Sequence, residues 1–90
     1  MDTPQQKSVL RTNRTARKVR KHYGAGTRVV VTRGAGMDPE PGAMHGTVKR
    51  HVPGTNAQGG HLVVTWDSGV TGNVSAGNLR REDGRAWPTG

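Results

Sequence analysis

Cysteine, phenylalanine and isoleucine are absent from this chain of 90 residues, and its aromatic side chains are two tryptophans and one tyrosine. Without cysteine the chain has neither a disulfide framework nor a thiolate zinc site. Hydrophobic residues make up 30% of the sequence, so the core has to be built from valine, leucine, tryptophan and methionine. This composition predicts one small domain of marginal stability, which a partner or a second copy would reinforce.

Acidic side chains and long hydrophobic runs are also scarce. Fourteen Lys and Arg stand against six Asp and Glu, and seven of the basic residues fall within the first 21 positions, where Asp2 is the one acid. A localised basic segment predicts a polyanionic partner, nucleic acid first and an acidic protein surface second. No segment is apolar enough to span a bilayer and no signal-peptide core follows Met1, so we expect a cytoplasmic protein with no membrane partner.

Residues 1–23 have the pattern of a basic amphipathic helix. Thr3-Pro4-Gln5-Gln6 has the form of a capping box at a helix start, and Gly24 and Gly26 supply a stop. At about 100° per residue, the charges line one side of the helix and small or apolar residues line the other. The cationic ridge consists of Lys7, Arg11, Arg14, Lys18 and Lys21. The opposite side consists of Val9, Thr12, Ala16, Val19 and Tyr23.

From Thr27 onward, short β-branched runs between Gly and Pro residues predict strands. The five predicted strands and one helical turn between the last two cover residues 28–32, 47–52, 61–66, 70–74, 76–78 and 79–81. Five short strands with a longer first loop predict a mainly β fold, a small and partly open barrel over residues 24–82, preceded by the basic helix.

The hairpin around Asp67-Ser68-Gly69 is the clearest turn in the chain. The strand before it places Leu62, Val64 and Trp66 on one face. We therefore predict that Trp66 is a core residue and that Trp87, in a flexible tail at 83–90, is not.

The order of motifs in residues 24–82 resembles that of small SH3-like barrels. The motifs are Gly26-Thr27-Arg28-Val29, Arg33-Gly34, His45-Gly46-Thr47-Val48, Val63-Val64-Thr65-Trp66-Asp67-Ser68-Gly69 and Asn78-Leu79-Arg80. They are most similar to Mib-Herc type domains and to small uncharacterised actinobacteriophage proteins. The resemblance implies a five-stranded SH3-like barrel, and Mib-Herc domains are implicated in peptide binding. An arginine-rich composition without isoleucine also fits an actinobacterium or its phages, which adds the virion as a location.

Catalytic and metal-binding patterns are missing from the sequence. The four histidines have no metal-ligand spacing, and no Ser/His/Asp constellation stands out. Asp38 and Glu40 flank prolines in a loop. The similar barrels of type II dihydrofolate reductases need a Val-Gln-Ile-Tyr run on a late strand for their active surface. The corresponding stretch here is Val70-Thr71-Gly72-Asn73-Val74. We expect no enzyme activity, no catalytic residue, no metal and no cofactor.

Two functions remain open. One is a nucleic-acid-binding protein that contacts phosphates with little sequence specificity, since aromatic residues are too few for extensive base stacking. The other is a protein-interaction module, such as a phage accessory or capsid-associated protein, whose basic arm docks on an acidic surface. The open barrel edge also allows a homo-oligomer. The residues predicted to contact the partner are Lys7, Arg11, Arg14, Arg17, Lys18 and Lys21 of the helix, with Arg33, Lys49, Arg50, Arg80 and Arg81 of the barrel as secondary contacts.

Overall fold

The computed structural model describes residues 14–34, 37–54 and 59–87. They form a helix, described over residues 14–22, followed by five strands and one 3-10 turn. In chain order the elements after the helix are β1 (Arg28–Val31), β2 (His45–Val52), β3 (His61–Trp66), β4 (Thr71–Val74), η1 (Ala76–Asn78) and β5 (Leu79–Arg81). The predicted capping box and the predicted contact residues Lys7 and Arg11 lie outside the described residues.

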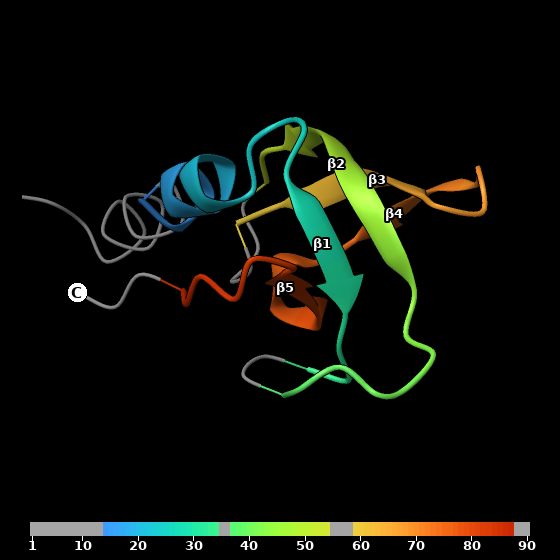
Figure 1. Ribbon diagram of the computed structural model, residues 1–90. Coiled ribbons are helices and arrows are strands. Elements are labelled where there is room, and N and C mark those ends of the chain that lie inside the picture. The colour runs from blue at the N-terminus through green and yellow to red at the C-terminus, as the bar shows by residue number, and fades with distance from the viewer. Residues whose placement is uncertain (1–13, 35–36, 55–58, 88–90) are drawn as a thin grey trace, which may run out of the picture.

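The strands form a single antiparallel sheet in the order β4-β3-β2-β1-β5. The first four follow one another as a meander, and β5 returns to pair with the free side of β1. Figure 1 shows the helix beside the end of the sheet where β1 begins. A helix followed by a five-stranded, mainly β fold was predicted and is confirmed. The sheet is not closed into a barrel, because β4 and β5 remain its two edges.

Glycine defines the turns at both ends of this framework. The helix closes with the bond from the Tyr23 amide to the Val19 carbonyl at 2.8 Å, and Gly26 then takes a φ of +90°. In the β3–β4 hairpin Gly69 has a φ of +93°, and its amide donates to the Trp66 carbonyl at 2.8 Å. A positive φ strains any residue with a Cβ. This explains why glycine occupies both the predicted helix stop and the predicted hairpin turn.

The core lies between the sheet and the helix. Its buried members are Val19, Tyr23, Val29, Val48, Leu62, Val64, Ala76 and Leu79. The alternation predicted for β3 is confirmed, since Leu62 and Val64 are fully buried on the core face. Of the residues predicted for the apolar side of the helix, Val19 and Tyr23 belong to this core and Ala16 is only partly buried, while Val9 and Thr12 lie outside the described residues.

Trp66 packs against the edge of this core and is only partly buried, so its prediction as a fully buried residue is corrected. It is the last residue of β3, directly before the hairpin turn. The ring lies over two glycines of the flanking strands. A Cβ on Gly46 would come within 2.8 Å of Trp66 Cε3, and one on Gly72 within 3.4 Å of Trp66 Nε1. Gly46 is therefore required for close approach rather than for an unusual φ.

Candidate nucleic-acid interface

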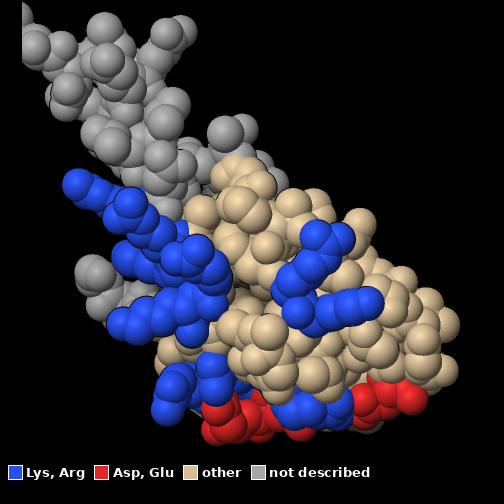
Figure 2. Space-filling view, turned by 90° about the horizontal axis from the view of Figure 1, so that it is seen from above, with Lys and Arg blue, Asp and Glu red and all other residues tan. Residues whose placement is uncertain are grey.

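The helix presents its charges to solvent because its other side is buried. Val19 is 1% exposed and Tyr23 is 4% exposed. The basic side chains around them are all exposed: Arg14, Arg17, Lys18, Arg20 and Lys21. Figure 2 shows basic side chains gathered over the helix at one end of the molecule. The described part of the predicted ridge, Arg14, Lys18 and Lys21, thus faces outward.

Contacts at both ends of the described helix hold it in one position on the sheet. Gly59, with a φ of +74°, lies so close to the helix backbone that a Cβ there would come within 2.9 Å of the Ala16 amide nitrogen. At the other end, the Tyr23 hydroxyl donates to the Leu79 carbonyl at 3.0 Å, and Arg81 Nη1 donates to the His22 carbonyl at 2.5 Å. The charged side of the helix is therefore presented at a fixed angle.

A β-bulge in β2 adds two cations near the end of the helix. Val48 pairs with Val64, but Arg50 pairs with Val63, so Lys49 is an extra residue in the ladder. Regular alternation would place Arg50 opposite Leu62 on the core face. The bulge instead leaves both Lys49 and Arg50 exposed.

Hydrogen bonds place this bulge next to the segment that leaves the helix. The Gly26 amide donates to the Val48 carbonyl at 2.8 Å, and the Val48 amide donates to the Thr27 carbonyl at 2.9 Å. The structure therefore brings Lys49 and Arg50 close to the C-terminal end of the helix. Figure 2 shows a second basic group over the sheet, beyond the helix.

The acidic side chains that the structure describes lie elsewhere, and each of them forms an ion pair. Each of the five carboxylates in the described residues forms an ion pair with a cation outside the helix and outside β2's bulge. The pairs are Arg28 with Asp67 and Glu82, Arg33 with Glu40, Arg80 with Asp38, and Arg81 with Asp83. Figure 2 shows the acidic side chains along one edge of the molecule, interleaved with basic ones. Within residues 14–34, 37–54 and 59–87, no carboxylate is within ion-pair distance of Arg14, Arg17, Arg20, Lys21, Lys49 or Arg50.

Arg28 is the centre of the paired region. Its guanidinium reaches Asp67, Glu82 and, at 3.0 Å, the Thr47 hydroxyl, and His45 Nδ1 lies 2.6 Å from Glu82. The bonds from Arg28 lower the pKa of Asp67, and those from His45 and then Arg28 lower the pKa of Glu82. The Arg81 guanidinium lowers the pKa of Asp83 to about 2. These carboxylates are held ionised, so they neutralise their own side of the molecule.

The predicted contact residues on the rest of the sheet are placed differently from those of the helix. Arg33 follows the far end of β1 from the helix and pairs with Glu40 at 2.6 Å. Arg80 pairs with Asp38, and Arg81 with Asp83. Arg33 is therefore not brought together with the helix cations, and Arg80 and Arg81 already have carboxylate partners.

An aromatic cluster at the end of the helix was not predicted. The Trp87 ring stacks on Tyr23 with centroids 6.2 Å apart and meets the edge of His22 at 5.3 Å. His22 is buried, and that burial, followed by the charge of Arg81, lowers its pKa. Trp87 itself is 39% exposed. The sequence feature that could have indicated this cluster is Trp87 itself. It is a large apolar residue in a polar tail, and such a residue tends to pack against another surface.

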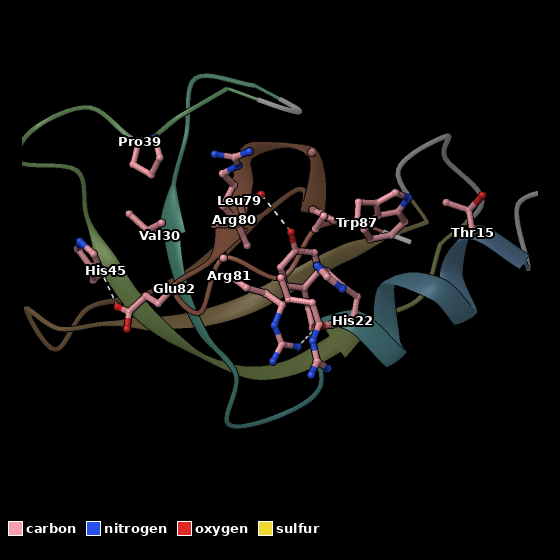
Figure 3. A pocket seen from close by; sticks show the side chains of 16 residues that line it. Thr15, His22, Val30, Pro39, His45, Leu79, Arg80, Arg81, Glu82 and Trp87 are labelled. Carbon is pink, nitrogen blue, oxygen red and sulfur yellow. Dashed lines mark hydrogen bonds and ion pairs between the residues drawn. The ribbon is translucent and has the colours of Figure 1, made fainter. Parts of the chain in front are cut away.

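A groove of about 810 Å³ runs along β5 beside this cluster. It is bounded by the helix at one end and by Pro39 and His45 at the other. Figure 3 shows Trp87 at the helix end of the groove, between Thr15 and His22, with Arg80 and Arg81 along its length.

The described residues contain no cluster of three or more His, Cys, Asp or Glu side chains that could hold a metal ion. None of the helical structure described in the chain is both long and apolar enough to cross a membrane. Comparison with known proteins gave no match to a protein-family model, to a curated protein or to a solved structure.

Proposed function

We propose that this protein binds nucleic acid through its phosphate backbone, without catalysis and with little sequence specificity. The main observation behind this proposal is that the ion-paired carboxylates and the cations without a carboxylate partner lie on different parts of the described surface. All five described carboxylates pair with cations of β1, β5 or the loop after β1, while six cations of the helix and the β2 bulge face solvent without one. Uncompensated positive charge on one face attracts a polyanion, and phosphate contacts carry no base information.

The fold supports this proposal because it presents the cations rigidly. The helix is fixed by Gly59 at one end and by Tyr23 at the other, and the bulge is tied to the linker after the helix. We take the contact set to be the helix cations together with Lys49 and Arg50. An acidic protein surface is the alternative partner, since it would meet the same charges.

Salt dependence of binding is the test. If Arg14, Arg17, Lys21, Lys49 and Arg50 each displace one counterion, log affinity for a 20-base-pair duplex should fall against log salt with a slope of about −4 to −5. Arg14→Glu with Lys21→Glu should flatten that slope by about two, for every duplex sequence alike. The matched control is Arg33→Glu with Arg80→Glu, which changes the net charge equally on the paired side and should affect binding much less.

Two outcomes would contradict the proposal. Equal weakening by both double variants would show that overall charge, rather than this face, determines binding. Absence of binding to duplex and single-stranded probes at low salt would exclude nucleic acid and favour the acidic protein surface.

We also propose that the sheet is of the SH3-like barrel type. Two observations support this: β5 returns to the free side of β1, and a single 3-10 turn, η1, leads into it. The residues that carry the resemblance have structural roles here, since Arg28 pairs with Asp67 and Gly46 lies under Trp66. An experimental structure with a different strand order would overturn this assignment.

A further inference from the structure

We propose that the groove along β5 accepts an unpaired base on the exposed face of Trp87, so that the protein prefers single-stranded nucleic acid to duplex. This inference rests on the proposed function and specifies its substrate. It is carried by three features that meet at one place: an exposed indole with a fixed position, a groove of suitable size and cations on both sides of it.

Contacts with neighbouring rings hold the Trp87 indole in one position, which favours stacking of a base on it. Tyr23 supports one side of Trp87, with an angle of 28° between the rings, and the edge of His22 touches it as well. Tyr23 is itself fixed by its bond to the Leu79 carbonyl. Trp87 remains 39% exposed despite these contacts and lines the groove, which is where a further planar group could approach its ring. Base stacking on an aromatic side chain needs this preformed arrangement and no particular base.

The groove has the size and lining that a nucleotide needs. Its volume of about 810 Å³ falls within the roughly 300–1,000 Å³ range of small-ligand sites. Apolar lining from Tyr23, Ala76 and Leu79 lies beside the arginine side chains of β5 and the segment after it. Arg85 adds a cation at the wall of the groove; its side chain forms no ion pair with a described carboxylate, although its backbone amide donates to Asp83 Oδ1 at 3.0 Å.

The groove adjoins the cationic side of the helix. Thr15 and His22, seven residues or about two helical turns apart, form its helix wall. At about 100° per residue the next sector toward solvent contains Lys18, Arg14 and Lys21. A strand whose phosphates lie along this sector can therefore turn one base toward Trp87. In a duplex the bases are paired and stacked inside, so only the phosphate contacts are available.

The experiment compares a 12-nucleotide oligothymidylate strand with a 12-base-pair duplex, using the full-length protein at one salt concentration. We expect Trp87→Ala to weaken binding of the single strand by about 10-fold or more, the range expected for loss of one stacked base. Duplex binding should change less than about two-fold, which also reports that the variant is folded. Trp87→Phe keeps a ring and should retain most of the single-strand affinity.

Fluorescence gives an independent readout. The single strand should quench the wild-type tryptophan emission, and Trp87→Phe should lose that quenching while still binding. The inference is overturned if Trp87→Ala leaves single-strand affinity unchanged, if it weakens strand and duplex equally, or if the strand binds without quenching. In each of these outcomes the wild-type protein still binds, so phosphate recognition stands. Loss of all binding in the wild type contradicts the proposed function itself.

Discussion

Arg28 holds Asp67 with two parallel bonds, from Nη1 to Oδ1 at 2.6 Å and from Nη2 to Oδ2 at 2.7 Å, although 39 residues separate them in the chain. The pair connects the start of β1 to the turn between β3 and β4. Glu82, directly after β5, reaches the same guanidinium. Four separate segments are thus joined on one face by a single side chain, since Thr47 of β2 also accepts a bond from it. Planar bidentate contact of this kind is specific to arginine.

Replacing Arg28 by Gln should change how acid unfolds the protein. Arg28 lowers the pKa of Asp67 and contributes to lowering that of Glu82. These carboxylates therefore stabilise the fold above their ordinary pKa of about 4, and this contribution is lost as pH falls through their lowered values. The variant should be less stable at pH 7 and should lose less further stability between about pH 5 and pH 3. Urea unfolding at several pH values measures this. Arg33→Gln is the control, and an unchanged pH profile in Arg28→Gln would contradict the role given to the pair.

His22 should make stability fall in a different pH window. Its pKa is lowered in the folded protein, mainly by burial and then by Arg81, so the unfolded chain takes up the proton more readily. Stability should therefore begin to fall as pH drops below about 6.5, the ordinary histidine value, and continue until the lowered pKa is reached. His22→Gln should lose this component of the pH dependence below about pH 6.5. His61→Gln on β3 should keep it, and a His22→Gln profile identical to the wild type would refute the assignment.

Tyr23→Phe tests the bond that fixes the end of the helix. The change removes only the hydroxyl that donates to the Leu79 carbonyl, a buried contact at 3.0 Å. We expect a loss of about 1–3 kcal/mol, because a buried acceptor is left without its donor. Thermal or urea unfolding gives the value. Thr71→Val, which removes an exposed hydroxyl contact with Thr65, is the comparison and should cost less. Equal losses would mean that the Tyr23 bond has no special role.

Gly46→Ala should be far more destabilising than Gly72→Ala. A methyl group on Gly46 would meet Val64 Cγ1 at 2.7 Å and the Thr65 carbonyl oxygen at 2.8 Å, and neither can move without disturbing β3. Overpacking of this kind costs about 1–3 kcal/mol. At Gly72 the contact is the Trp66 indole nitrogen at 3.4 Å, which a small ring shift relieves. Denaturant midpoints compare the two variants, and a larger loss at Gly72 would show that Trp66 is packed differently.

Local sequence patterns predicted the elements well because their causes are local. The strands at residues 28–32 and 61–66 are β-branched runs, and β1 and β3 follow them closely. The turn at Gly69 and the turn at Gly26 after the helix depend on a positive φ, which few residue types other than glycine favour. Val19 and Tyr23 faced the core as their helical spacing predicted.

The features that were missed depend on distant residues. Nothing near Arg28 in the sequence indicates that Asp67 and Glu82 will be its partners, and Trp87 reaches His22 across 65 positions. The bulge at Lys49 could not be predicted from the sequence either, because it is a property of the pairing between β2 and β3. Composition predicted the excess of positive charge. Pairing in three dimensions determines which cations are left free.

The bulge at Lys49 also affects how this surface can change in evolution. Elsewhere in a strand, adding or deleting one residue moves every later side chain to the opposite face. At position 49 the ladder already contains an unpaired residue. Deleting Lys49 would leave Val48 opposite Val64 and Arg50 opposite Val63. The register of the pairing between β2 and β3 would therefore be unchanged. The charge on this face can therefore be lowered by deleting a residue as well as by replacing one, because the deletion leaves the same side chains facing the core.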